Sequence, residues 1–267
     1  MRARPLLAST AAVAALSLSV ATAPAAQAVS DRPPTAPADI VDLADVAPDI
    51  LHDIQYRTKH NFVGQRIDGY REARCLLTRD AARQLAAVQK DVVAQGYTLK
   101  VYDCFRPQRA VDHFVRWAER LDDQTMKREF YPRVDKSTLF DDGYIAERSG
   151  HSRASTVDLT LVELPAKPQR RWTPRQGLRP CYSPQGVRFR DNSIDMGTGY
   201  DCFDTLSHTD DPRTTPEQRA NRQRLVSAMA RGGFVNYEKE WWHYTLRDEP
   251  YPDTYFDFPV SRRSLCP

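Results

Sequence analysis

Apolar positions between residues 78 and 121 predict two helices with a strand between them. Residues 78–95 read as a helix capped by Thr78 and ended by Gly96. The alternation in Tyr97–Asp103 (YTLKVYD) predicts a strand. A second helix opens at Pro107, in the first turn. The positions expected to face inward are Ala81, Leu85, Val88 and Val92 in the first helix, and Ala110, Val111, Phe114, Ala118 and Leu121 in the second.

The later part of the chain mixes strands with one more helix. Residues 156–162 (TVDLTLV) predict a buried strand, and residues 234–246 (FVNYEKEWWHYTL) predict one or two strands. Between them a helix begins at Thr215-Pro216, with Gln218 completing a capping box, and Gly232-Gly233 ends it. Because no regular βαβ rhythm is present, we expect an α+β fold, a mainly antiparallel sheet with flanking helices in a single domain.

The N-terminal residues have the layout of a secretory signal peptide. A short basic segment (MRAR) precedes an apolar, small-residue stretch, and Ala26-Gln27-Ala28 supplies a cleavage site. We expect a signal peptide over residues 1–28, with an uncleaved anchor as the alternative, and a secreted protein in the extracellular or cell-wall space. A Pro-rich leader is expected over 29–48, the domain over 49–260 and a tail over 261–267.

The net charge and the cysteines indicate which partners and which disulfides to expect. Residues 1–28 hold two of the 38 basic residues and no acid, so residues 29–267, with 35 acids, carry a net charge of +1. This balance argues against nucleic acid as a partner. Five cysteines leave at least one unpaired, and Cys181–Cys202 is the pairing we expect, since these two bracket a loop-rich stretch. That stretch includes a Pro- and Arg-rich excursion, residues 163–192, with seven basic residues and no acid between Lys167 and Arg190.

Two short segments carry candidate metal ligands. In SGHSRASTVDLTLV (149–162), His151 on a Ser/Gly loop and Asp158 inside the strand offer ligands that zinc accepts. Taken alone, such a pair more often indicates a surface histidine and a strand with a polar edge. In EKEWWHY (238–244), His243 is a further ligand and Glu240 a carboxylate able to take a proton from water. The alternatives there are a Trp-rich core strand and Glu238 as the base.

A cationic candidate stands between a predicted strand and helix. Arg106 in VYDCFRPQ (101–108) could stabilise a developing oxyanion or hold a substrate carboxylate. The competing interpretation is a structural ion pair with Asp103. Together the three segments supply a His/Asp/His metal set with an open fourth position, a base and a cation, as a catalytic zinc site requires.

These segments resemble the zinc D-alanyl-D-alanine dipeptidases (the VanX type). YDCFRPQ, SGHSRASTVDLTLV, DMGTGYDCFD (195–204) and EWWHY occur in the family's order, and NFVGQRIDGY with RCLL resemble its N-terminal region. The resemblance covers about residues 50–247. It implies one Zn²⁺ per chain on His151, Asp158 and His243, Glu240 as catalytic base and Arg106 as the group that stabilises the tetrahedral intermediate. It also implies that Ser149 and an acid hold the substrate's amine, with Asp195 the first choice and Asp201 the other.

The resemblance implies an enzyme that cleaves D-Ala-D-Ala or a close relative. Combined with the expected signal peptide, it suggests a secreted enzyme that acts in peptidoglycan turnover. The alternatives are a D,D-carboxypeptidase on peptidoglycan stem peptides and a non-catalytic, zinc-stabilised wall-binding module. We expect a small D-amino-acid dipeptide as partner, no stable membrane insertion after signal cleavage, and cell-wall contact through the basic excursion. This excursion is longer than the family leads us to expect, and either edges the site or decorates the surface. Ala154 stands where the family has Gly; because Ala disfavours positive φ, a slightly different loop is expected there.

Overall fold

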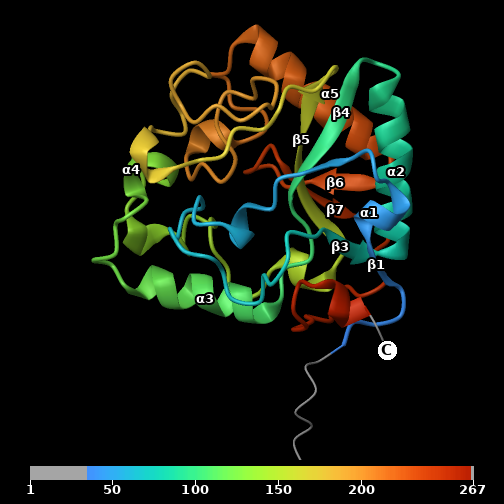
Figure 1. The fold of residues 1–267 in the computed structure, drawn as a ribbon. Coiled ribbons are helices and arrows are strands. Elements are labelled where there is room, and N and C mark those ends of the chain that lie inside the picture. Colours follow the sequence, from blue (N-terminus) through green and yellow to red (C-terminus); the bar gives the residue numbers. More distant parts are fainter. Residues whose placement is uncertain (1–34, 266–267) are drawn as a thin grey trace, which may run out of the picture. The chain divides into compact units, whose positions relative to one another are not determined.

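A five-stranded sheet forms the centre of the computed structural model, which describes residues 35–265 (Figure 1). The strand order is β2-β4-β5-β7-β6; β2 and β4 run parallel, and the other three neighbouring pairs are antiparallel. The prediction of an α+β fold with a mainly antiparallel sheet is confirmed. A separate two-stranded antiparallel sheet pairs β1 with β3. The strands are β1 Ile40–Asp42, β2 Leu51–His52, β3 Leu76–Thr78, β4 Tyr97–Asp103, β5 Thr156–Glu163, β6 Phe234–Asn236 and β7 His243–Leu246.

Helices flank the central sheet. Helix α2 packs on β4 and on α5, and α5 packs on β6. In Figure 1, α2 lies to the right of the sheet and α3 to the left. No helix within residues 35–265 is both long and apolar enough to cross a membrane. The α-helices are α1 Leu43–Val46, α2 Arg79–Val93, α3 Gln108–Glu119, α4 Lys127–Phe130 and α5 Pro216–Arg231, and the 3₁₀ turns are Gln55–Arg57, Lys136–Thr138, Gly150–Arg153, Pro174–Gln176, Thr205–Ser207 and Arg262–Leu265.

The cap signals in the sequence work as predicted for two long helices. The Thr78 side chain accepts a hydrogen bond from the backbone N–H of Ala81 and caps α2. Thr215 and Gln218 form a reciprocal capping box at the start of α5, with a proline in its first turn. The predicted apolar face of α2 is buried, as are Ala110, Val111, Phe114 and Ala118 of α3.

Helix α3 differs from the prediction at both ends. Pro107 is its N-cap, with extended backbone angles, and lies one residue before the helix. At the other end Arg120 leaves the helical region, with φ −85° and ψ 80°, so that the helix ends at Glu119. Leu121, predicted to face inward, therefore lies beyond the helix and is 52% exposed.

The packed region extends past the predicted 49–260 at both sides. Ile40 and Leu43, within the expected leader, are buried, and β1 pairs with β3. The expected tail forms a 3₁₀ turn at Arg262–Leu265, and the carbonyl of Ser264 accepts a hydrogen bond from the backbone N–H of Ala36. Short elements such as these carry too little periodicity to be recognised in the sequence. The predicted signal peptide, the first part of the leader and Cys266 lie outside the described residues.

Two disulfides connect distant segments. Cys181–Cys202, the predicted pair, is confirmed. A second bridge, Cys75–Cys104, was not predicted; it joins the residue before β3 to the residue after β4. Cys104 of this second bridge stands two residues before Arg106, so the bridge helps to position the segment between β4 and α3.

Candidate active site

The three predicted metal ligands converge from three elements. His151 lies on the 3₁₀ turn Gly150–Arg153, Asp158 lies in β5, and His243 is the first residue of β7. The β5–β7 register pairs Asp158 directly with His243. His151 reaches the same point because the chain folds back through the turn before entering β5. On a straight strand, two residues seven positions apart would point to opposite faces of the sheet. The turn removes this conflict for His151 and Asp158.

The donor atoms of these ligands have the spacing of a tetrahedral site. His151 Nε2 lies 3.1 Å from Asp158 Oδ1 and 3.2 Å from His243 Nδ1, and His243 Nδ1 lies 3.1 Å from Asp158 Oδ1. A tetrahedral zinc with bonds of about 2.1 Å separates neighbouring donors by about 3.4 Å. The two imidazoles and one carboxylate therefore fit a zinc ion and leave its fourth position open to the cavity. No other group of three such side chains gathers among residues 35–265.

Neighbouring groups orient these ligands. The Nδ1 of His151 lies 2.7 Å from the carbonyl oxygen of Cys104, so Nδ1–H donates there and Nε2 keeps its lone pair for the metal. The Tyr200 hydroxyl donates to Asp158 Oδ2 at 2.9 Å, leaving Oδ1 for the metal. Although burial raises it, the two histidines hold the pKa of the Asp158 carboxyl well below its usual range.

Glu240 belongs to the turn that joins β6 to β7. The Asn236 side-chain amide donates to the carbonyls of both Glu240 and His243, at 3.0 Å each, and so fixes this turn. Glu240 Oε2 lies 3.6 Å from His243 Nδ1. The carboxylate is thus beside the ligand cluster without belonging to it, as a proton acceptor for water requires.

The environment of Glu240 opposes a negative charge. Burial, and then the nearby Asp158 carboxylate, raise the pKa of Glu240 to about 8. A cation held by the three ligands would counter both effects, because a bound metal ion is the largest local charge in such a site.

Arg106 forms the structural ion pair and also lies at the ligand cluster. Its guanidinium pairs with Asp103 Oδ2 at 2.9 Å, and Nη2 also lies 3.5 Å from Asp158 Oδ2. The rings of Tyr56 and Phe114 lie 5.1 Å and 5.3 Å from its Cζ. The structural ion pair therefore holds the cation in place at the ligand cluster.

A cavity of about 230 Å³ opens onto the cluster. Asp158, His243, Glu240, Arg106 and Ser149 all line it. Ser149 caps the turn that carries His151, accepting from its backbone N–H at 3.3 Å, and Arg106 Nη1 donates to the same hydroxyl at 3.4 Å.

Of the two acids proposed for the substrate amine, the structure brings only Asp201 into this cavity. It is buried, and Tyr56 donates its hydroxyl to Oδ2 at 2.8 Å. Burial, and then Asp158, raise the pKa of Asp201 well above its usual range. An ammonium group beside Asp201 would offset the free-energy cost of ionising this buried carboxyl.

Asp195, the first choice at the sequence level, lies elsewhere. Its carboxylate accepts from Arg188 at 2.7 Å, from the backbone N–H of Gly197 and from Gln218, each at 2.9 Å. It lines a different cavity beside the start of α5. The structure does not bring Asp195 to the ligand cluster, because the loop turns sharply between the two acids, with Asp201 itself at φ 54°.

Three side chains that support the site were missed. Tyr56 binds Asp201, Tyr200 binds Asp158, and Asn236 holds the turn of Glu240. Tyr200 stands inside the segment DMGTGYDCFD, between the acids Asp195 and Asp201. Tyr56 and Asn236 carry no such local signal.

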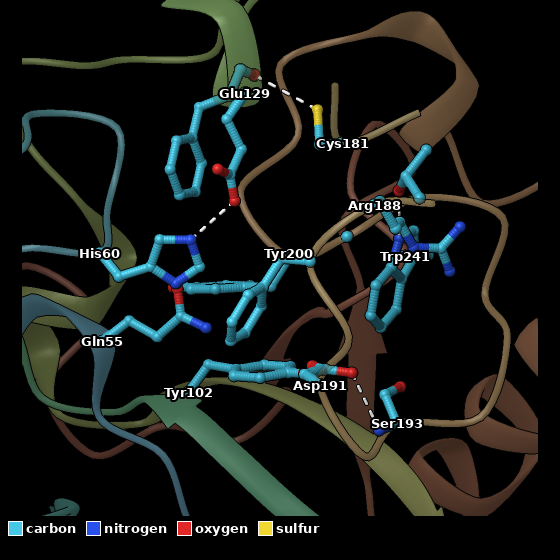
Figure 2. A pocket seen from close by; sticks show the side chains of 14 residues that line it. Gln55, His60, Tyr102, Glu129, Cys181, Arg188, Asp191, Ser193, Tyr200 and Trp241 are labelled. Atoms are coloured by element: carbon cyan, nitrogen blue, oxygen red, sulfur yellow. Dashed lines mark hydrogen bonds and ion pairs between the residues drawn. The ribbon is translucent and has the colours of Figure 1, made fainter. Parts of the chain in front are cut away.

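Behind Asp158, Tyr200 stacks on Tyr102 with ring centroids 4.4 Å apart (Figure 2). A β-bulge after Val101 interrupts the strand register here. The Tyr102 hydroxyl donates to Asp191, at the end of the excursion 163–192. No residue of 163–192 lines the 230 Å³ cavity, so the excursion does not edge the site; it supports the site from behind through this stack.

Ala154 takes the left-handed conformation of a glycine, with φ 61° and ψ 22°, and it is fully buried. The methyl group has therefore not moved this residue out of the positive-φ region. The backbone N–H of Ala154 donates to the carbonyl of His151 and closes the turn.

Comparison with known proteins agrees with this geometry. A family model described as D-ala-D-ala dipeptidase matches residues 36–166 and 187–261. The chain belongs to this dipeptidase family. It is therefore a hydrolase. The matched ranges leave out residues 167–186, which lie in the middle of the basic excursion.

Three curated members of the dipeptidase family align with this chain over nearly the whole of their own length. A D-alanyl-D-alanine dipeptidase of Streptomyces coelicolor is 38% identical over 84% of this chain and 98% of its own. The D-alanyl-D-alanine dipeptidase of Enterococcus faecium is 35% identical over 82% and 96%, and that of Enterococcus faecalis is 37% identical over 78% and 92%.

Proposed function

We propose that this dipeptidase hydrolyses free D-Ala-D-Ala with one zinc ion held by His151, Asp158 and His243, and that it acts outside the cytoplasm on peptides of peptidoglycan turnover. The observation that carries the proposal is the meeting, in one cavity, of three ligands with an open position, a separate carboxylate and a buried acid. The names of the relatives support the choice of dipeptide.

Zinc in this site would act as a Lewis acid and make a water molecule acidic enough to attack at neutral pH. The protein's own groups then complete the reaction. The Glu240 carboxylate takes the proton of the attacking water and delivers it to the leaving amine nitrogen. The Arg106 guanidinium, held by Asp103, donates to the oxyanion that develops on the peptide carbonyl.

Selection of dipeptides rests on Asp201. A free dipeptide carries an ammonium group on the residue whose carbonyl is attacked, whereas a stem peptide carries further residues there. Asp201 is the carboxylate in the cavity that neither ligates nor serves as base, and its burial favours a cation beside it. An amine-binding acid at this place would admit dipeptides and reject longer chains.

Export is inferred from the residues 1–28 alone, and the two disulfides of the described part are compatible with it. An exported enzyme cannot reach a cytoplasmic pool of dipeptide, so the proposed role is the trimming or scavenging of released peptides. Finding the protein retained inside the cell would contradict this part of the proposal.

The test measures D-alanine release by the purified, zinc-loaded protein from free D-Ala-D-Ala and from a pentapeptide with the same C-terminus. We expect release from the dipeptide, and a fall in kcat of about 10²–10⁴-fold in Glu240→Gln with bound zinc unchanged. Glu238→Gln, an exposed acid two residues away, is the matched control and should keep full activity. Release chiefly from the pentapeptide would instead support the D,D-carboxypeptidase.

A further inference from the structure

One segment of this protein, Lys167–Arg190, carries basic residues with no acid among them and is here called the basic loop. Residues 29–267 carry a net charge of +1, and the basic loop alone contributes seven basic residues and no acid. The remainder of residues 29–267 is therefore net negative by six. The near-neutral total, which argued against nucleic acid as a partner, conceals this separation of charge along the chain.

The protein itself leaves these cations almost entirely unneutralised. Within residues 35–265, Arg188 is the one member of the basic loop that forms an ion pair, with Asp195 at 2.7 Å. In contrast, Arg109, Arg133 and Arg153 elsewhere are each paired with an acid. The exposed members of the basic loop without an ion pair are Lys167, Arg170, Arg171, Arg175, Arg179 and Arg190.

The basic loop is fastened to the core at several points. Cys181 forms a disulfide with Cys202, and its backbone N–H donates to the carbonyl of Glu129. The Trp172 ring stacks on the imidazole of His60, with centroids 5.0 Å apart and planes within 8°. The amine of the buried Lys100 donates to Gln169 at 2.9 Å. The arginines are therefore displayed on a folded scaffold.

Part of this surface is concave. A pocket of about 180 Å³ is lined by Arg170, Arg179 and Arg190, together with Arg188. One acid, Glu129, also lines it; Glu129 is buried, and its Oε1 lies 2.6 Å from His60 Nε2 (Figure 2). Arg188 is already paired with Asp195, which leaves three guanidinium groups without an ion pair around the one carboxylate of Glu129. This excess of positive charge favours an anion, and the planar guanidinium matches a phosphate group with two parallel hydrogen bonds.

We propose that the basic loop is a docking surface for an anionic polymer with repeating phosphodiester groups, one phosphate entering the pocket and its neighbours contacting the flanking arginines. The aromatic rings of the loop do not offer a platform for nucleic-acid bases. Trp172 and Phe189 lie against His60, and the guanidinium of Arg133 covers Tyr182 at 4.0 Å. A concave site also suits a flexible chain better than a flat membrane.

This proposal is independent of the dipeptidase reaction. The basic loop does not line the 230 Å³ cavity, and most of it, residues 167–186, lies outside the family match. The loop is thus an addition to the family's scaffold that can hold the enzyme near a polymer while the active site remains free.

The experiment measures binding of the full mature protein to poly(glycerol phosphate) by fluorescence anisotropy between 50 and 300 mM salt. The variant Arg170→Gln/Arg179→Gln/Arg190→Gln removes the three exposed pocket cations. The matched control Arg66→Gln/Arg83→Gln/Arg247→Gln removes three exposed arginines elsewhere that also form no ion pair. We expect the pocket variant to raise Kd at least about tenfold and to flatten the slope of log K against log salt by about 2, because each lost phosphate contact accounts for ~0.7.

We expect the control variant to bind the polymer with native affinity. Both variants should keep native dipeptidase activity and thermal unfolding. Absence of binding by the native protein at 50 mM salt would overturn the proposal. Equal weakening in the two triple variants would also overturn it, since net charge alone would then explain the binding. Tighter binding of a single-stranded DNA oligonucleotide, or of phosphatidylglycerol vesicles, would replace the polymer by that other partner.

Discussion

At the scale of single residues, the Tyr200 hydroxyl decides which oxygen of Asp158 is available to a metal. We expect Tyr200→Phe to lower zinc affinity about 10–100-fold, because losing the hydrogen bond to Oδ2 frees the carboxylate to rotate. Competition with a zinc chelator measures the change. Tyr102→Phe is the control, since it keeps the ring stack and loses a hydroxyl that contacts Asp191 instead. Native affinity in Tyr200→Phe would show that other contacts orient Asp158.

Asp201 and Asp195 offer a paired test of amine recognition. We expect Asp201→Asn to raise KM for the free dipeptide more than about tenfold, since a buried charge pair with the ammonium is worth more than 1.4 kcal/mol. The same variant should lose most of the native preference over an N-acetylated dipeptide. Asp195→Asn, whose carboxylate faces Arg188 and Gln218, should leave both quantities unchanged. Steady-state kinetics with the two substrates decide it, and equal effects of the two variants would contradict the assignment.

At the scale of elements, the Cys75–Cys104 bridge closes a separation of 29 residues between β3 and β4. Replacing both cysteines by Ser should lower the free energy of unfolding by about 3–4 kcal/mol, from the entropy that the cross-link removes from the unfolded chain. Urea unfolding measures it. Cys181→Ser/Cys202→Ser, with a separation of 21 residues, should cost nearly as much in stability. Only the first pair should also weaken zinc binding, because the carbonyl of Cys104 accepts the hydrogen bond from His151.

Local patterns account for much of the fold and of the site. The spans of α2, β4 and α5 followed from spacing and caps. The ligands and Glu240 stood out in short segments, and the order of those segments, shared with the family, suggested their roles. Features that depend on how segments distant in sequence meet in the fold could not be predicted from local patterns. The choice between Asp195 and Asp201 depends on the path of an irregular loop, and Cys75–Cys104 depends on how two elements meet. Three-residue strands such as β1 are too short for periodicity.

At the scale of the whole molecule, zinc should contribute to stability as well as to catalysis. The three ligands come from two strands and a turn, so an ion bound only by the folded state shifts unfolding by mass action. Free zinc at 100 times its Kd should add about 2.7 kcal/mol, or a Tm shift of roughly 5–10 °C at this size. Calorimetry with chelator, and then with zinc restored, measures the shift. In Asp158→Asn the zinc-dependent part should be much smaller; a full shift there would place the ion elsewhere.

The hydrogen bond from His151 to the carbonyl of Cys104 has a consequence for the order in which the enzyme matures. A newly made chain with reduced cysteines has a more mobile acceptor for the imidazole and should take up metal poorly. Oxidation of Cys75 and Cys104 would then precede efficient metal loading. The protein would then be less active during synthesis and gain full activity where disulfides can form, so that dipeptides needed for wall synthesis inside the producing cell are spared.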